Sequence, residues 1–240
     1  VNGGDGNDAI VLVGTTTADQ YDSGDITNAD GSGLNLSSII SLANLNERAV
    51  SEVIAGDIID GGSGVNTLFI YGTVDLTGIT LSNVTILELQ SNVTLTPEQL
   101  AQFTTVNGDG NSIINIVVPP GSSVSYILDL SSIDVSQIGS INIDGDLTIK
   151  ISKDEDLSGI TQITSTAGSV ITVEVDASAE TTVNLSTLAD VFDEVDVISL
   201  DEQATLMVED PADITDLNLG EVDGTGTIET DGSSEVDTAL

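Results

Sequence analysis

From about residue 65 onward, apolar and polar residues alternate in short runs along the chain. One spacing, apolar-x-x-apolar-x-apolar-x-x-x-apolar-x-apolar, recurs most clearly from Val84, Ile138 and Val195. Period-two alternation over so few residues predicts strands that bury one of their two faces. The polar interval between the two alternating runs of each copy predicts a corner, where the chain turns from one strand into the next.

Weaker copies of this spacing begin at Phe103, near Ile163 and at Leu217, so that successive starts lie 19, 35, 25, 32 and 22 residues apart. Repeats of about 20 to 50 residues are typical of solenoids, because one unit cannot bury its apolar face alone. We therefore predict an all-β fold, a parallel β-helix or β-solenoid with short helices in its N-terminal part and at coil corners. A β-sandwich, which also has short alternating strands, is the alternative.

Two segments carry helix signals instead. In residues 37–54, four apolar residues recur at the spacing of one helix face, and Gly56 follows as a stop signal. A second, shorter helix is predicted after Thr96, because Pro97 at its first position and Gln99 at its third complete a capping box. The apolar face of the longer predicted helix consists of Leu42, Leu45, Ala49 and Val53.

A glycine-rich nonapeptide stands apart from these patterns. Residues 3–11 read GGDGNDAIV and fit G-G-x-G-x-D-x-U-x, where U is a large aliphatic residue. Residues 61–69 repeat it with Asn66 in the aspartate position, and a preceding half copy places Asp57 in that position. A third, decayed copy at residues 107–114 has lost the carboxylate to Ser112.

Repeats of this kind build a parallel β-roll whose glycine-rich turns hold Ca²⁺. The glycines allow positive φ angles and let backbone carbonyls point at one spot, and the aspartate adds a hard anionic oxygen. The alternative is that these segments are ordinary turns between strands. The separation of the copies along the sequence favours that alternative, because the calcium sites of a β-roll lie between stacked copies.

The charge of the chain is one-sided. Its 240 residues include 3 lysines and arginines against 40 aspartates and glutamates, for a formal net charge of −37, with no cysteine or histidine. Binding of nucleic acid or of an anionic membrane surface depends on basic residues, so neither partner is expected. No apolar run reaches the roughly 18 residues of a membrane-spanning helix, so membrane insertion is not expected either. The surplus of carboxylates favours divalent cations.

Together these motifs resemble the RTX (repeats-in-toxin) proteins of Gram-negative bacteria, most closely their surface-layer and adhesin-type members. In those proteins nonapeptide blocks alternate with stretches such as residues 79–89 here. The resemblance implies Ca²⁺ as a cofactor for folding, export by a type I secretion system, and an extracellular location at the bacterial cell surface. Its implied Ca²⁺ ligands are Asp8, Asp57 and Asn66, with the backbone carbonyls of Gly3, Gly4, Gly6, Gly61, Gly62 and Gly64.

Composition and the repeated spacing divide the chain into three parts. Residues 1–64 form a Gly/Asp-rich RTX-like segment with the helix of residues 37–54, residues 65–229 form the solenoid with coils of roughly 19–35 residues, and residues 230–240 form an acidic tail. Residues 15–36 are predicted to be a long loop whose carboxylates face solvent.

The function expected from this organisation is a structural module of a secreted surface-layer or assembly protein, which depends on Ca²⁺ and associates with itself or with cell-surface polysaccharide. A Ca²⁺-dependent carbohydrate-binding adhesin domain is the alternative. A polysaccharide-degrading enzyme is less favoured, because there is no histidine or cysteine and 40 carboxylates make any one pair uninformative. Ice binding is also less favoured, since no column of threonines repeats in the sequence.

Overall fold

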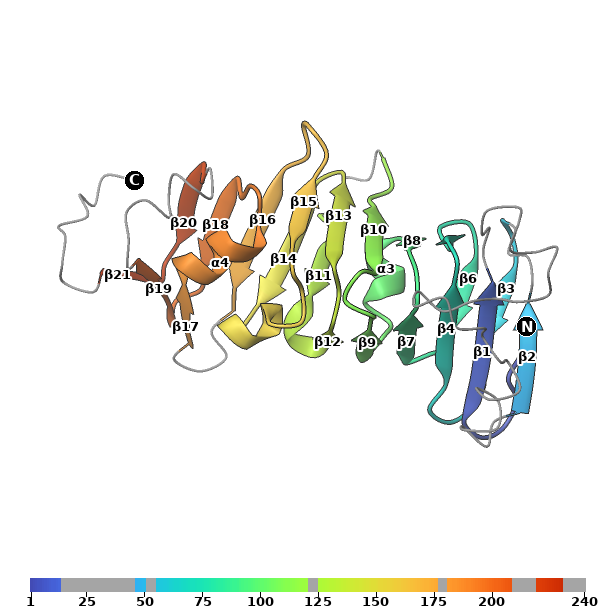
Figure 1. Ribbon diagram of the computed structural model, residues 1–240. Coiled ribbons are helices and arrows are strands. Elements are labelled where there is room, and N and C mark those ends of the chain that lie inside the picture. Colours follow the sequence, from blue (N-terminus) through green and yellow to red (C-terminus); the bar gives the residue numbers. More distant parts are fainter. Residues whose placement is uncertain (14–45, 51–54, 121–124, 177–180, 209–218, 231–240) are drawn as a thin grey trace.

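The computed structural model describes residues 1–13, 46–50, 55–120, 125–176, 181–208 and 219–230. The predicted loop of residues 15–36, the tail from residue 231 and most of the predicted helix of residues 37–54 lie outside these ranges. In Figure 1 the strands are stacked side by side along one direction, from the N-terminal end (blue) to the C-terminal end (red). No helix in the described ranges is long and apolar enough to span a membrane.

Three larger sheets run along the molecule, and all their strand pairs are parallel. The first sheet contains β1 (Asp8–Val13), β2 (Asn46–Val50), β4 (Thr67–Tyr71), β7 (Ile86–Leu89), β9 (Thr105–Asn107) and β12 (Asp134–Ser136). The second contains β5 (Val74–Asp75), β8 (Val93–Leu95), β10 (Ile113–Val117), β13 (Ser140–Asp144) and β15 (Ile163–Ser165). The third contains β11 (Ile127–Asp129), β14 (Leu147–Ile151), β16 (Ile171–Val175), β18 (Val197–Leu200) and β20 (Glu221–Gly224).

Two smaller parallel sheets and four short helices make up the rest of the regular structure in the described ranges. The smaller sheets contain β3 (Ile58–Asp60) with β6 (Thr80–Ser82), and β17 (Thr181–Asn184) with β19 (Ala204–Val208) and β21 (Thr227–Thr230). Among the described residues, the α-helices are α3 (Pro97–Leu100) and α4 (Leu185–Val191), and the 3₁₀ helices are η1 (Leu130–Ser132) and η2 (Asp154–Leu157).

This arrangement is the predicted parallel β-solenoid. From β3 onward, a residue and its partner in the next coil are separated by 19 positions at least, as for Leu68 and Leu87, and by 29 at most, as for Thr105 and Asp134. These separations fall within the predicted range of 19–35. The β-sandwich alternative is wrong, because sandwich sheets are antiparallel whereas the strands here pair in parallel.

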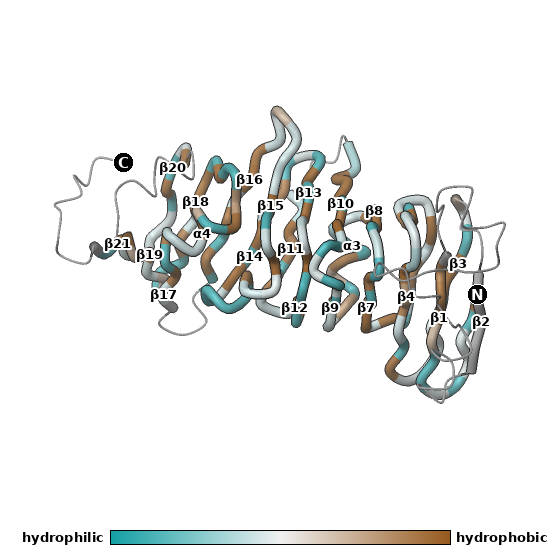
Figure 2. Tube along the Cα trace, viewed as in Figure 1, coloured by the Kyte–Doolittle hydropathy of each residue, from teal (hydrophilic) through white to brown (hydrophobic). Residues whose placement is uncertain are grey.

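The core consists of aliphatic side chains that stack from coil to coil. Ile10, Leu68, Leu87 and Val106 occupy one register position in four successive strands of the first sheet, and each is at most 1% exposed. Figure 2 shows the same alternation of hydrophobic (brown) and hydrophilic (teal) residues along most strands. Stacking therefore gives each coil the apolar contacts that it cannot make alone.

The helix predicted for residues 37–54 is wrong at residues 46–50, which form strand β2. β2 pairs in parallel with β1, from Asn46 beside Asp8 to Val50 beside Leu12. The edge of β1 offers unpaired backbone groups, and pairing with them overrides a helical periodicity that is only a weak preference. The other predicted helix is confirmed as α3, where the Thr96 side chain accepts from the Gln99 backbone N–H (3.3 Å) and the Thr96 N–H donates to Gln99 Oε1 (2.9 Å).

Candidate functional site

The turns of the two nonapeptides lie on top of one another, although 58 positions separate them in the sequence. Gly3 N donates to the Asp60 carbonyl (2.8 Å), and Ser63 N donates to the Gly4 carbonyl (2.9 Å). Strands β1 and β4, which follow the two turns, continue the same stack. The separation of the copies along the sequence is therefore no argument against a site between them, because the two turns are in contact in the fold.

Close approach of the two turns explains their glycines. Gly62 has a φ of 78°, and a Cβ at this position would come closer than 3.0 Å to the Gly4 carbonyl oxygen. Gly64 has a φ of 106° and would clash in the same way with the Gly6 carbonyl oxygen. Only glycine combines these backbone angles with such a close approach of backbone to backbone.

Asp8, the first residue of β1, is the unusual group of the stacked turns. It is 1% exposed, and both of its carboxylate oxygens are buried without a hydrogen-bond partner. A Cβ placed on Gly3 would lie within 3.0 Å of both Asp8 Oδ2 and the Gly61 carbonyl oxygen, so these two oxygens line the same small space. Because an unpartnered buried carboxylate is costly, the space between these oxygens is a candidate position for a cation.

Asn66 occupies the position of Asp8 in the next coil. It is fully buried, its Oδ1 accepts from the Asp8 backbone N–H (2.9 Å), and its Nδ2 donates to the Asn83 carbonyl (2.8 Å). A Cβ placed on Gly61 would lie within 3.0 Å of both Asn66 Nδ2 and the Asn83 carbonyl oxygen. We call the space beside Asp8 and Gly3 the first rung, and the space beside Asn66 and Gly61 the second rung. The two rungs share one geometry, but the second has an amide N–H group where the first has a carboxylate oxygen.

The first rung offers the type of oxygen ligand that a hard cation prefers, but fewer ligands than such a cation takes. Ca²⁺ takes six to eight oxygen ligands from carboxylates, backbone carbonyls and water. The stacked turns supply the Asp8 carboxylate and the Gly61 carbonyl at one place. Within the described ranges, no group of three or more acidic, histidine or cysteine side chains is placed to hold a metal. A cation here would therefore be held mainly by carbonyls and water.

The structure brings together eight of the nine predicted site residues. The ninth, Asp57, lies at the opposite end of β3 from the glycine turn, where its carbonyl accepts from Thr80 N (2.9 Å). The decayed third copy lies at a different corner, between β9 and β10. Its Asp109 side chain accepts from Ser112 Oγ (2.8 Å), so that turn is closed by its own residues. The residues brought together are Gly3, Gly4, Gly6, Asp8, Gly61, Gly62, Gly64 and Asn66.

Asn83 was not expected from the glycine motif, because it belongs to a shorter turn without glycine. Its φ of 55° is positive, a conformation that asparagine tolerates better than most residues. Its Nδ2 donates to Asp60 Oδ1 (2.7 Å), and this bond, ahead of the one from Gly62 N, lowers the pKa of Asp60. An asparagine in a short turn between two strands was the one sequence signal that could have indicated that Asn83 bonds to the glycine turn.

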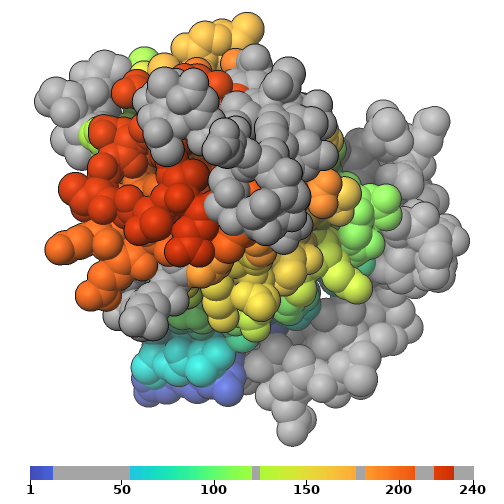
Figure 3. All heavy atoms as spheres, turned by 90° about the vertical axis from the view of Figure 1, so that its left-hand side faces the viewer, coloured from blue at the N-terminus to red at the C-terminus, as the bar shows by residue number. Residues whose placement is uncertain are grey.

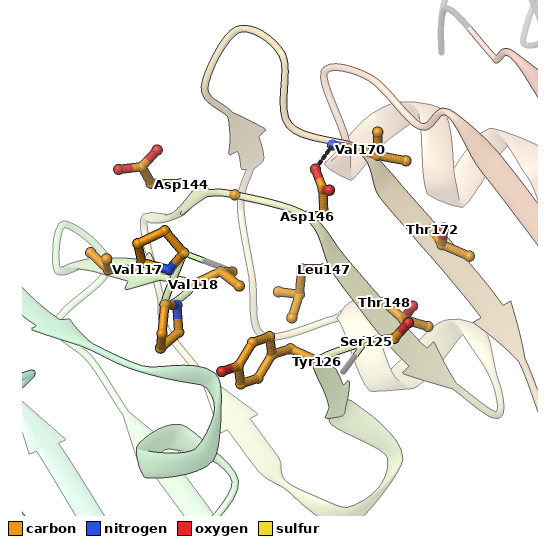
Figure 4. Close-up of a pocket in the computed structure, with 13 residues that line it drawn as sticks. Val117, Val118, Ser125, Tyr126, Asp144, Asp146, Leu147, Thr148, Val170 and Thr172 are labelled. Carbon is orange, nitrogen blue, oxygen red and sulfur yellow. Dashed lines mark hydrogen bonds between the residues drawn. The ribbon is translucent and has the colours of Figure 1, made fainter. Parts of the chain in front are cut away.

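A second candidate site is an open groove of about 830 Å³ beside β10, β11 and β14 (Figure 4). Tyr126 and the consecutive Pro119 and Pro120 contribute apolar surface to its lining. Asp144 and Asp146 contribute carboxylates, whose Oδ1 atoms accept from Thr166 Oγ1 (2.9 Å) and from Val170 N (2.8 Å). The groove thus combines an aromatic ring with hydrogen-bond acceptors.

Lys150 does not have the properties of a catalytic base. Its Nζ lies 3.7 Å from Glu174, which is in the neighbouring strand β16, and 2.7 Å from Asp176, which follows that strand. The hydrogen bond to Asp176 raises the pKa of Lys150, which keeps the amine protonated. A protonated amine cannot accept the proton that a lyase removes from an acidic sugar.

Comparison of the chain with protein-family models, with curated proteins and with solved structures finds no match. The functional argument therefore rests on the stacked turns and on the groove.

Proposed function

We propose that this chain is a structural module of a secreted, RTX-type bacterial cell-surface protein, and that Ca²⁺ at the stacked glycine turns holds its first coil in place. The observation that carries the proposal is the buried Asp8 carboxylate, which has no hydrogen-bond partner and shares a small space with the Gly61 carbonyl oxygen. The net charge of −37 supports it, because a polyanion gains from binding a divalent cation.

Calcium titration of the whole chain tests this proposal. If Ca²⁺ binds the folded state alone, a free concentration of 100 times Kd raises the free energy of unfolding by about 2.7 kcal/mol. We expect calorimetry to show saturable binding, and thermal unfolding to shift upward with Ca²⁺ but not with an equal ionic strength of NaCl. Weak binding that NaCl abolishes would instead indicate a diffuse polyanion and would refute the site.

The variant Asp8→Asn locates the site, and Asp5→Asn is its matched control. Asp5 lies in the same turn but is exposed, and its Oδ1 accepts from Ser63 Oγ (3.0 Å), a bond that asparagine can also accept. We expect Asp8→Asn to lose saturable Ca²⁺ binding and Asp5→Asn to keep it. Equal Ca²⁺ binding by both variants would move the site away from Asp8.

Assembly is the second part of the proposed role. Strands β20 and β21 end their sheets on the C-terminal side within the described residues, and Figure 3 shows them (red) in front of the earlier coils. Open strand edges favour pairing with another copy, whereas the charge of −37 opposes it. We expect light scattering to detect larger species in Ca²⁺ than in chelator at matched ionic strength. An unchanged molar mass would argue against assembly by this chain.

The groove favours carbohydrate binding as a second candidate function. A sugar ring could pack its C–H face on Tyr126, while its hydroxyls donate to Asp144 and Asp146. Titration of neutral oligosaccharides by NMR tests this idea. We expect Tyr126→Ala to lose binding and Ile127→Ala, at the exposed neighbouring residue, to retain it. Binding that survives Tyr126→Ala would exclude the groove.

A further inference from the structure

We infer that the calcium dependence is confined to the first rung of the stack, and that Asn66 is what ends it there. In this inference, which rests on the proposed function, Ca²⁺ controls the docking of β1 on β4, while the coils from β4 onward hold without metal. The cation thus holds β1, next to the end of the first sheet, and is not a requirement for the whole fold.

The chemical difference between the two rungs carries this inference. At the first rung, Asp8 Oδ2 and the Gly61 carbonyl line one space, and both are acceptors. At the second rung, Asn66 Nδ2 donates to the Asn83 carbonyl (2.8 Å) across the equivalent space. The amide N–H thus does at the second rung what a cation does at the first, so the second rung has no need of metal.

The second rung is also anchored independently of the first. Gly61 N donates to the Ser82 carbonyl (2.9 Å), and Gly62 N donates to Asp60 Oδ1 (3.0 Å). Asp60 Oδ1 also accepts from Asn83 Nδ2 (2.7 Å), which ties the second turn to the third coil. These bonds, together with the one from Asn66 Nδ2 to the Asn83 carbonyl, do not involve β1 and hold both ends of the second turn.

The end of the first sheet can open without opening the coils from β4 onward. Ile10 and Leu12 belong to the continuous core, and Ala9 and Val11 are buried as well. Among the described strands, β1 lies between β4 and the end strand β2. In a linear stack each unit contacts only adjacent units, so β1 and β2, the two strands beyond β4, can open together. Opening β1 would expose the edge of β4, which is a surface for pairing with another strand.

Hydrogen exchange measured by mass spectrometry on the full chain tests the inference, in saturating Ca²⁺ and in chelator at neutral pH. For the unmodified protein, we expect chelation to lower the protection of residues 8–13 at least tenfold. Residues 86–89, 147–151 and 171–175, which lie in β7, β14 and β16, should keep their protection.

Two variants exchange the chemistry of the rungs. Asp8→Asn copies the second rung onto the first, and we expect residues 8–13 to be equally protected with and without Ca²⁺. Asn66→Asp copies the first rung onto the second, and we expect the calcium-dependent region to extend to residues 67–71. If Asn66→Asp exchanges like the unmodified protein in chelator, Asn66 does not have the role assigned to it.

The outcomes separate the inference from the proposed function. Loss of protection throughout the chain on chelation would overturn the inference but leave the calcium site standing. Unchanged protection of residues 8–13 on chelation of the unmodified protein would overturn both. Asp8→Asn must abolish the calcium response of residues 8–13, because a response that persists in this variant would also overturn the inference.

Discussion

Gln99 is expected to be the most costly polar residue to remove from the solenoid. It is 7% exposed and projects from α3, which follows β8 in the chain, toward the preceding coil. Its Nε2 donates to the carbonyls of Leu76 (2.6 Å) and Ile79 (3.1 Å), and its Oε1 accepts from Thr96 N (2.9 Å). One buried amide therefore connects two coils at a corner where a helix replaces a strand.

The cost of Gln99→Ala follows from the partners that it would leave unsatisfied. The Leu76 carbonyl keeps a bond from Ile79 N (3.0 Å), whereas the Ile79 carbonyl and the Thr96 N–H lose the bond to this side chain. At about 1–3 kcal/mol for each of these two buried groups left unpaired, we expect a loss of about 2–6 kcal/mol in the free energy of unfolding. Gln99→Glu should cost more at neutral pH, because it places an anionic oxygen against two carbonyls.

The assay is urea unfolding followed by circular dichroism in saturating Ca²⁺, with Gln102→Ala as the control. Gln102 lies just after the same helix but is exposed, and its one bond, to the Glu98 carbonyl, is long (3.3 Å). We expect the control to cost less than about 0.5 kcal/mol. A cost below about 1 kcal/mol for Gln99→Ala, at an unchanged urea dependence, would refute the reasoning.

Three further predictions concern other parts of the fold. Gly62→Ala should lower the free energy of unfolding by roughly 1–3 kcal/mol more than Gly4→Ala in thermal unfolding. Both glycines have a positive φ, but only at Gly62 would a Cβ clash with a carbonyl oxygen. Equal effects of the two substitutions would contradict this. Leu87→Ala, at a fully buried position, should cost about 2–5 kcal/mol in urea unfolding, and a cost under 1 kcal/mol would be evidence against a stacked core. The Lys150 hydrogen bond lowers the pKa of Asp176 below its ordinary 3.8, so its stabilising effect is complete above that pH and is lost as the pH falls through the folded-state value. Carboxyl NMR titration should show that pKa rising in Lys150→Met, and an identical midpoint in both proteins would contradict the assignment.

Local chemistry was readable from the sequence wherever neighbouring residues decide it. Every apolar position of the three best copies of the repeated spacing is buried, as Val84, Ile138 and Val195 illustrate. The capping box at Thr96 was readable for the same reason, since its partners lie three residues apart. The glycine motif likewise indicated turns with positive φ, because the shape of such a turn depends on its own residues.

The position of each copy in the solenoid was decided only by the tertiary structure. The copy at Val84 spans β7 and β8, the copy at Ile138 spans β13 and β14, and the copy at Val195 spans β18 and β19. These corners join different pairs of sheets, although their local pattern is the same. Pattern alone does not specify the corner, because the lengths of the intervening loops determine where each coil closes.

The candidate site shows the same division. The sequence by itself determined that residues 3–11 and 61–69 form glycine turns, each followed by a strand. Only the tertiary structure showed that these turns contact one another across 58 positions. It also showed that Asp57 lies at the other end of β3 and that Asn66 bonds to Asn83. Contacts between coils depend on which backbones meet, and no local pattern records that. The difference between a carboxylate without a partner and an amide with one therefore became visible only once the coils were stacked.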